Sequence, residues 1–558
     1  MQMTAGRRLL VATLGLFVLR AVLSLPRTGP LVVADEAGYL LNARALTGGL
    51  HGTLTTAPFY RGGYSLLLTP LVALHLSPET TYRLVLVLNA ALAASLVPLL
   101  YAVLTRCFSV RPDHAVWAAV AAAAYPSATT LSQVALSENA LFPLVVAWAL
   151  LAGGLAAARG RSALWLAAAT GGTAAACYVV HGRMVVVGVA TVLEIAWLAA
   201  FKRISPFAAG LGVATLAAGL AAARWLDDFL VRTNWGGQRP DEVGDRLSSV
   251  DNVDGVLRFL GNLVGSTWYL TVGTLGVVAL LLLSGSARRH LDGLRRRDAP
   301  AASLVLGLLL VVTAGLLVLS ALSFPDVERP DMLIYGRYAE VTMPPLLALA
   351  LATLGRGLQR LRVRAALVAT SAIVIVGTVA VVALRAGAHP TGKANRWNIA
   401  SLPFFTFDLQ PTVLVAAGLV TLGALAVVAA VILRRPAALA PLALVAFLAV
   451  AAVAERNPVL SSERSVYGGG WTSPASAVHG GPIGYDLAAY DVFGLYAYQW
   501  FLPHDAFVPF RGRVPATRHV IAARETQRRG WTMVWASPHQ DQAIFRVSPK
   551  QRASTVSP

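Results

Sequence analysis

The sequence is poor in charged residues, cysteine and lysine. Of its 558 residues only 13% are charged, 56% are hydrophobic, and the mean hydropathy is +0.63. Soluble domains carry about 25% charged residues, so this composition excludes an ordinary soluble domain and indicates a polytopic membrane protein. Cys107 and Cys177 both lie in or beside apolar segments. We expect both to be buried and free, with no disulfide and no metal cluster.

The charge that is present is mostly basic and sums to +19. In a soluble chain that excess would suggest a nucleic-acid partner. Here the basic residues gather in short runs between apolar stretches, as in the cytoplasmic loops of membrane proteins. We therefore expect membrane lipids as partners and no nucleic acid. The near absence of lysine beside abundant alanine and arginine is typical of GC-rich coding DNA and favours a bacterial origin.

About thirteen apolar stretches predict membrane-spanning helices, since a span needs about 20 apolar residues. They run roughly over 8–25, 81–104, 115–130, 136–158, 163–180, 184–200, 206–223, 263–284, 301–322, 338–355, 365–385, 411–433 and 437–454. With a cytoplasmic N-terminus, the basic clusters between them all fall on one side, as the positive-inside rule requires. The first stretch could instead be a cleaved signal peptide, although no convincing small-residue cleavage site follows it.

The chain divides into two predicted domains. Residues 1–454 form a transmembrane domain with a long first outer loop over 26–80, and residues 455–558 form an extracytoplasmic domain in a multi-pass protein of the cell membrane. The tail lacks a spanning stretch, and its apolar runs at 519–521, 532–535 and 543–547 predict strands of a small α/β domain. Its tyrosines and tryptophans suit either stacking on a glycan or a structural core.

The outer loop begins with the adjacent acids Asp35 and Glu36, followed by two apolar stretches too short to span, which predict interfacial helices. Acids are favoured in a first helical turn, so the pair could simply begin a helix. Glu138 lies inside the apolar stretch 134–155, where an ionisable group costs about 2.5–3.5 kcal/mol and usually faces a cavity or a partner. Alternatively it is the first-turn acid of a helix capped by Ser137.

Three arginines fall on the same outer side, where a phosphate could be bound. They are Arg183, Arg337, which precedes Tyr338, and Arg61. The planar guanidinium binds phosphate through two parallel hydrogen bonds, but each of these arginines could instead snorkel to the membrane interface. Tyr338 could hydrogen-bond a phosphate or belong to the aromatic belt.

The order of these elements resembles the GT-C superfamily of glycosyltransferases, polytopic enzymes that use polyprenyl-phosphate sugars. The resemblance spans about residues 1–350. It rests on Asp35-Glu36 after the first span, Tyr60 to Pro70, Ser137-Glu138-Asn139, and Gly336-Arg337-Tyr338 at the outer start of a later span. Arg61-Gly62 is a departure, because relatives often have prolines there. The resemblance implies a polyprenyl-phosphate sugar donor, an extracytoplasmic glycan, lipid or protein acceptor, and hexosyl or pentosyl transfer.

The reaction itself suggests roles for these residues. Transfer from a sugar phosphate requires a base that removes the proton of the acceptor hydroxyl, and Asp35 is the predicted base. We expect Glu36 to support it and Glu138 to contact acceptor, donor sugar or metal. Arg183, Arg337, Tyr338 and Arg61 are the predicted ligands of the donor phosphate. A single displacement with a base and no separate nucleophile predicts inversion.

A cofactor cannot be identified from the sequence. The acid-rich loop 224–262 leaves a divalent metal open, but its spacing is not that of an EF-hand. No phosphate-binding or dinucleotide-binding glycine pattern follows a strand, in agreement with a lipid-linked donor. The alternative function is a transporter or flippase for lipid-linked saccharides, which would predict inverted repeats and paired charges at the membrane midplane. The sequence shows neither.

Overall fold

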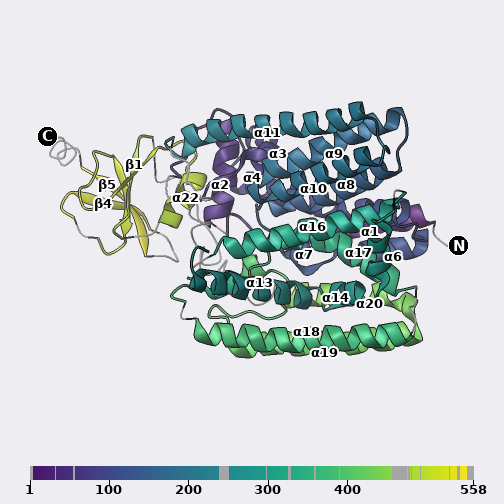
Figure 1. The fold of residues 1–558 in the computed structure, drawn as a ribbon. Coiled ribbons are helices and arrows are strands. Elements are labelled where there is room, and N and C mark those ends of the chain that lie inside the picture. The colour runs from purple at the N-terminus through teal and green to yellow at the C-terminus, as the bar shows by residue number, and fades with distance from the viewer. Residues whose placement is uncertain are drawn as a thin grey trace.

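The computed structural model of the chain is a bundle of long helices with a small sheet at one end (Figure 1). It describes residues 4–31, 33–54, 57–237, 250–296, 298–324, 328–356, 360–388, 390–454, 474, 478, 480–489, 492–526, 528–536 and 541–548. The fold within these ranges confirms the prediction of an all-α polytopic membrane protein with a small C-terminal α/β unit.

Nine helices in the described ranges are long and apolar enough to cross a membrane. They are α4 (Pro78–Ala94) continuing through α5 (Leu96–Ala102) and η1 (Val103–Cys107), α8 (Glu138–Ala157), α9 (Arg161–Val180), η2 (Gly182–Met184) with α10 (Val185–Ala200), α11 (Pro206–Asn234), α16 (Ala301–Leu322), α18 (Arg360–Gly387), α19 (Pro411–Arg434), and η6 (Pro436–Ala438) with α20 (Leu439–Ala454). A tenth span forms if α13 (Val253–Gly273) and α14 (Val277–Leu283), which meet at a 104° bend, are counted together.

Three of the predicted spans differ from expectation, although each is helical. The stretch 115–130 is divided into α6 (Pro112–Ala123) and α7 (Pro126–Leu131), because Pro126 starts a new helix instead of continuing the first. The stretch 338–355 consists of η4 (Ala339–Thr342) and the short α17 (Met343–Leu354). The first stretch is α1 (Ala5–Ser24), which is not among the nine and whose Arg20 is buried and donates to the Ala123 carbonyl.

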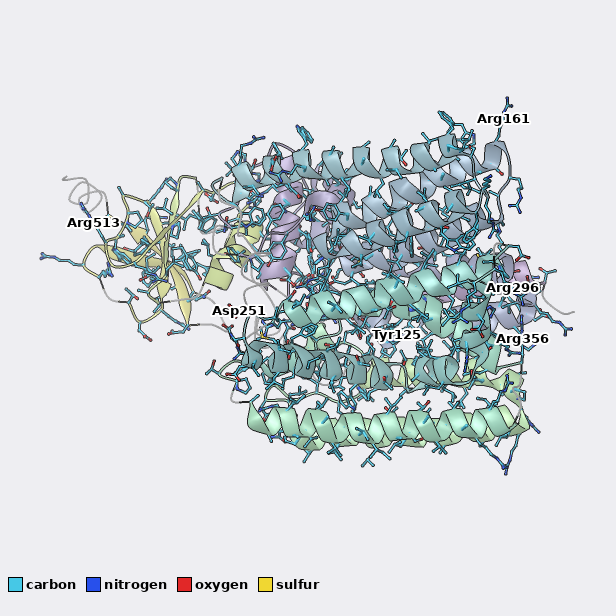
Figure 2. The ribbon with its side chains drawn as sticks, viewed as in Figure 1. Tyr125, Arg161, Asp251, Arg296, Arg356 and Arg513 are labelled. Carbon is cyan, nitrogen blue, oxygen red and sulfur yellow. The ribbon has the colours of Figure 1, made fainter. Side chains whose placement is uncertain are left out.

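The two ends of the bundle differ in their charged side chains. Figure 2 shows Arg161, Arg296 and Arg356 at the end near the N-terminus, and Asp251 and the sheet at the opposite end. The short α15 (Ser286–Gly293), which carries Arg288 and Arg289, packs against α14 and α16. This separation follows the charge pattern of the sequence, whereas the assignment of the arginine-bearing end to the cytoplasm remains a prediction.

The first outer loop contains the two expected short helices, α2 (Val33–Leu46) and α3 (Gly62–Val72). They are not alike. On α2, Ala37, Leu40, Leu41 and Ala43 have no exposed surface, because the helix packs between α3 and the C-terminal helix α22 (Val492–Phe501). Within the described residues α2 is thus covered by protein on these faces, and its position at the membrane interface stays a prediction. The acids at its N-terminus are held inside the protein.

The C-terminal unit is a five-stranded sheet in the order β2-β1-β3-β5-β4. Its strands are β1 (Ile483–Asp486), β2 (Phe507–Phe510), β3 (His519–Ala523), β4 (Trp531–Ala536) and β5 (Gln542–Val547). β1 pairs in parallel with β2 and β3, and β5 pairs antiparallel with β3 and β4. The three strands predicted in the tail are confirmed. The predicted domain boundary after 454 stays a prediction, because 455–473 lie outside the described residues.

The aromatic residues of this unit are mostly internal. Tyr485, Tyr496, Tyr498 and Trp500 are at most 4% exposed, so they form its core and its contact with the bundle. The described side chains therefore favour the structural interpretation of the tail aromatics over a glycan-stacking surface.

Candidate active site

Arg337 lies between two carboxylates that come from different helices. Its Nη2 is 2.8 Å from Oδ2 of Asp35, and its Nε is 2.7 Å from Oε1 of Glu138. Asp35 stands in the first turn of α2, Glu138 is the first residue of α8, and Arg337 belongs to the segment between η3 (Pro330–Ile334) and η4. The structure thus brings together three residues that the sequence analysis singled out separately.

The three side chains differ in their access to solvent. The side chain of Asp35 is 22% exposed, that of Arg337 5%, and that of Glu138 not at all. Both carboxylates stand in the first turn of a helix, where the free N–H groups and the helix dipole favour negative charge. Asp35 is therefore the carboxylate that a substrate can reach, whereas Glu138 pairs with Arg337 on its buried side.

The charge of Arg337 is fixed by these neighbours. Burial is the largest single effect and lowers the pKa of Arg337, but the surrounding negative groups, Glu138 foremost, together raise it well above its ordinary value. A second contact comes from Asn398, whose Oδ1 is 3.3 Å from Nη1 of Arg337. The amide of Asn398 in turn donates to Asp331 at 2.7 Å. The guanidinium is thus held in one orientation from three directions.

The segment that carries Arg337 is anchored on its other side to the bundle. Glu340 accepts hydrogen bonds from Ser127 at 2.6 Å and from Tyr269. A Cβ at Gly336 would collide with the ring of Tyr269, so this ring can lie against the segment only because residue 336 is glycine. These contacts join α7 and α13 to the turn that presents Arg337.

Asp35 has a second partner in Tyr60. The Tyr60 hydroxyl donates to Oδ1 of Asp35 at 3.0 Å. Its ring lies directly on Gly38, where any Cβ would overlap it, so the missing side chain lets Tyr60 reach across α2. Burial, followed by the charge of Asp35, raises the pKa of Tyr60 well above its ordinary value. Tyr39 packs beside it, with ring centroids 5.4 Å apart.

The loop before Tyr60 is held from two directions. Asn234 at the end of α11 donates to Oδ1 of Asn42 at 2.7 Å and accepts from the Gly52 amide at 2.9 Å. Gln499 of α22 accepts from the Thr53 amide at 2.6 Å and donates to the Thr53 carbonyl at 3.3 Å. The C-terminal unit therefore helps to fix the loop that positions Tyr60.

Arg183 and Tyr338 form a second feature next to this group. The guanidinium carbon of Arg183 is 3.6 Å from the centroid of the Tyr338 ring, and that of Arg337 is 5.3 Å from it. His181 also contacts this ring, with centroids 4.6 Å apart. Arg183 is 9% exposed, and its Nη1 is buried without a hydrogen-bond partner among the described residues. A cation stacked on an aromatic ring with free N–H groups is suited to an anion.

Glu36 faces away from this group. Its Oε1 accepts from the Leu31 amide at 2.6 Å, and its Oε2 accepts from the Ala135 amide at 2.6 Å and from the Tyr82 hydroxyl at 2.5 Å. Consecutive helical residues point about 100° apart, and these contacts direct Glu36 away from Arg337 while Asp35 faces it. The contacts fit a structural clamp between α2, α4 and the start of α8 better than the predicted supporting role in catalysis.

Arg61 is also taken up by structural partners. Its Nη1 is 2.9 Å from Oδ2 of Asp227, and its Nη2 donates to the Tyr178 hydroxyl at 2.8 Å. The guanidinium also stacks on the Tyr178 ring at 3.9 Å. The side chains of Arg61 and Asp227 are 10% and 3% exposed. Of the predicted phosphate ligands, Arg61 is therefore the one that the geometry favours least.

The described residues contain no group of three or more His, Cys, Asp or Glu side chains that could hold a metal ion. Part of the acid-rich loop, 238–249, lies outside the described residues. The pair Asp35 and Glu138 is neutralised by Arg337 instead of meeting around an open cation site. Residues 35 and 138 therefore do not fit the first coordination sphere of a metal as they stand.

Four residues of this group were not identified as site residues from the sequence: Tyr60, Tyr39, Asn398 and Asp331. Tyr60 carried a signal, because it begins the segment Tyr60 to Pro70 on which the resemblance partly rests. Tyr39 lies one turn after Asp35 on the same helix. Asp331 and Asn398 lie in two different segments between predicted spans, where no local pattern marks them.

Comparison with known proteins gives matches among solved structures only. No protein-family model and no curated protein match the sequence. ArnT from Cupriavidus metallidurans in the apo state is similar with a TM-score of 0.55 and 14% identity, over 100% of both chains. The same protein bound to undecaprenyl phosphate gives a TM-score of 0.54, again at 14% identity, over 98% of this chain and 99% of that one. This likeness shows the fold, and it confirms the GT-C fold expected from the sequence.

Proposed function

We propose that the chain is an integral-membrane glycosyltransferase that transfers a sugar from a polyprenyl phosphate to a hydroxyl group of an extracytoplasmic acceptor. The observation that carries the proposal is the position of Arg337 between the accessible Asp35 and the buried Glu138, with Arg183 on the adjoining Tyr338 ring. The site thus offers a base and a cation for a leaving phosphate in one place.

Asp35 acts as the general base in this proposal. The acceptor oxygen attacks the anomeric carbon while its proton passes to Asp35, and the bond between that carbon and the phosphate oxygen breaks. The departing polyprenyl phosphate takes the bonding electrons. Tyr60 and Arg337 hold the two oxygens of Asp35, so its carboxylate is aimed before the acceptor arrives.

Arg183 is the best candidate to stabilise the leaving phosphate. Its charge is not neutralised by any carboxylate in the described ranges, and its Nη1 lacks a hydrogen-bond partner there. Negative charge grows on the phosphate as the bond breaks, and a fixed cation placed there stabilises the transition state more than the ground state. Arg337 and Tyr338 line the same place, although two of the three nitrogens of Arg337 already face carboxylates.

The geometry supports inversion. A retaining reaction would need one carboxylate as nucleophile and a second as acid and base. Glu138 has no exposed surface and is paired with Arg337, which leaves Asp35 as the accessible member of this pair of carboxylates. One base and one displacement invert the anomeric centre, and determination of the product's anomeric configuration by NMR tests this step.

The donor class has two supports. The fold is shared over the whole chain with ArnT, a protein solved with undecaprenyl phosphate bound. The candidate site also lies at one end of a membrane-spanning bundle, beside the first turn of α8, where a lipid-anchored phosphate can arrive laterally. The sugar can be a hexose or a pentose, and the acceptor a cell-wall glycan, a lipid or a protein.

The direct test uses sealed membrane vesicles loaded with a polyprenyl phosphate that carries a radiolabelled sugar. We expect the unaltered protein to release free polyprenyl phosphate and to move the label to a product that no longer extracts with the donor lipid. If the label crosses the bilayer while still attached to its lipid, and no free polyprenyl phosphate forms, the chain is a transporter for lipid-linked sugars and the proposal is wrong.

A further inference from the structure

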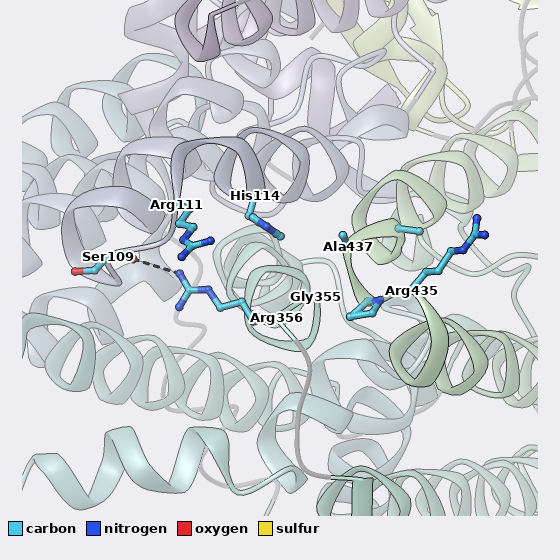
Figure 3. Close-up of a pocket in the computed structure, with 9 residues that line it drawn as sticks. Ser109, Arg111, His114, Gly355, Arg356, Arg435 and Ala437 are labelled. Carbon is cyan, nitrogen blue, oxygen red and sulfur yellow. Dashed lines mark hydrogen bonds between the residues drawn. The ribbon is translucent and has the colours of Figure 1, made fainter. Parts of the chain in front are cut away.

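A groove opens at the end of the bundle opposite the candidate active site (Figure 3). It forms where α6 and α20 begin and where α17 and α19 end. Its volume is about 1030 Å³, and it is lined by Ser109, Arg111, His114, Gly355, Arg356 and the segment 435–438. The arginine-bearing ends of the spans therefore surround a hollow instead of a flat surface.

The groove is basic. Arg111, Arg356, Arg435 and His114 line it, and none of its lining residues is acidic. Nη2 of Arg356 donates to the Ser109 carbonyl at 3.2 Å, which holds this side chain close to Arg111 (Figure 3). The acid next to His114 in sequence, Asp113, is paired with Arg8.

No carboxylate in the described ranges forms an ion pair with the arginines of the groove, so their repulsion is not offset within that part of the chain. Guanidinium groups brought together in this way attract an anion, and phosphate matches their geometry.

Apolar side chains extend from the groove toward the middle of the bundle. Trp117, one turn after His114 on α6, is 43% exposed. Leu433 precedes Arg435 at the end of α19 and is 38% exposed, and Leu442 on α20 is 37% exposed. Residues three or four apart lie on one face of a helix, so Trp117 continues the face of α6 on which His114 lines the groove. A basic groove followed by an apolar surface matches the headgroup and the acyl chains of a phospholipid, whereas a free anion would use the basic groove alone.

We propose that this groove binds the phosphate headgroup of an anionic phospholipid, with the acyl chains lying along α6, α19 and α20. Arg111 and Arg356 contact the phosphate, and Arg435 and His114 border it. The bound lipid neutralises the clustered arginines and fixes the ends of four helices relative to one another. The proposal does not depend on glycosyl transfer, because the site lies at the other end of the bundle.

The test measures lipid binding to the full chain in detergent by native mass spectrometry. Phosphatidylglycerol is compared with phosphatidylcholine that has the same acyl chains. The groove variant is Arg111→Gln with Arg356→Gln, and the matched control is Arg161→Gln with Arg288→Gln, which removes the same charge from exposed positions outside the groove. All four arginines are exposed, so all proteins should unfold at the same temperature.

We expect the groove variant to bind phosphatidylglycerol about tenfold more weakly, with phosphatidylcholine binding unchanged and the control variant like the unaltered protein. Equal losses of phosphatidylglycerol binding in both variants would mean that the lipid is attracted to basic loops in general, and would contradict a specific site in the groove. Unchanged binding in the groove variant would overturn it as well. Displacement of the lipid by excess inorganic phosphate would show an anion site without a lipid preference and would contradict the proposed occupant.

Discussion

Arg337 and Asp35 form an ion pair in which Nη2 and Oδ2 are 2.8 Å apart. The pair joins the first turn of α2 to the segment before α17, two parts of the chain that are far apart in sequence. On the other edge of the same guanidinium lies Glu138, so a single buried cation organises both acids. The catalytic proposal depends on this arrangement, because it leaves Asp35 aimed and accessible while Glu138 is enclosed.

Replacing Arg337 should cost both stability and activity. Arg337→Met leaves Glu138 buried without a counter-charge, which costs about 3–5 kcal/mol for a fully buried pair, and it releases Asp35. We expect a lower unfolding temperature in detergent and no detectable transfer. The double variant with Glu138→Gln should regain most of the stability and none of the activity. Recovery of transfer in the double variant would show that Arg337 serves only to neutralise Glu138.

Arg183→Gln should weaken the use of donor without destabilising the fold. Arg183 stacks on Tyr338 and has no carboxylate partner in the described ranges, so its loss breaks no ion pair shown by the structure. We expect kcat/KM for the lipid-linked donor to fall about tenfold or more, because a charge-assisted bond to the leaving phosphate is lost. Arg232→Gln, at an exposed position on α11, is the matched control. An unchanged kcat/KM would remove Arg183 from the donor site.

Tyr60 should keep its proton across the alkaline range. The ordinary pKa of tyrosine is about 10, and burial with the charge of Asp35 raises that of Tyr60, so the protonated donor persists to higher pH. We expect the transfer rate to stay level between about pH 8 and pH 10. Tyr60→Phe should lower the rate about tenfold at every pH in that range, through loss of the bond to Asp35. Tyr101→Phe is the control. A transfer rate of the unaltered protein that falls as the pH approaches the ordinary tyrosine pKa of about 10 would contradict this role.

Removal of divalent metal should leave the transfer rate unchanged. Asp35 and Glu138 are already neutralised by Arg337, and the described residues offer no cluster of three metal-ligating side chains. We expect equal initial rates with and without an excess of EDTA, measured on protein purified without added metal. A loss of activity that magnesium, manganese or calcium restores would show that a metal takes part, for example through the residues of loop 224–262.

Part of the candidate site could be predicted because ionisable residues are rare within or beside apolar stretches. Glu138 is an ionisable group in an apolar stretch, and Asp35 lies in the outer loop about ten residues after the first predicted span. A buried ionisable group is costly unless a partner is present, and the structure supplies that partner in Arg337. The strands of the tail were equally visible, since alternation of apolar residues is a local property.

The individual roles were harder to predict because they depend on distant partners. Glu36 is adjacent to Asp35, yet its oxygens are bound by the Leu31 and Ala135 amides and by Tyr82. The guanidinium of Arg61 could bind a phosphate, but Asp227 on α11 pairs with it. Neither partner leaves a mark in the sequence around the residue it binds. The break between α6 and α7 was visible in principle, because Pro126 lacks the N–H needed to continue a helix.

The most direct test of the account is the initial rate of sugar transfer by Asp35→Asn, measured with radiolabelled polyprenyl-phosphate sugar. Asparagine keeps the size of the side chain but cannot take the acceptor's proton. Asp228→Asn, at an acid on α11 whose side chain is 46% exposed and pairs with Arg224, is the matched control. We expect Asp35→Asn to transfer sugar at least about a hundredfold more slowly and the control to match the unaltered protein. Transfer by Asp35→Asn at the original rate would contradict the assignment of Asp35 as the base.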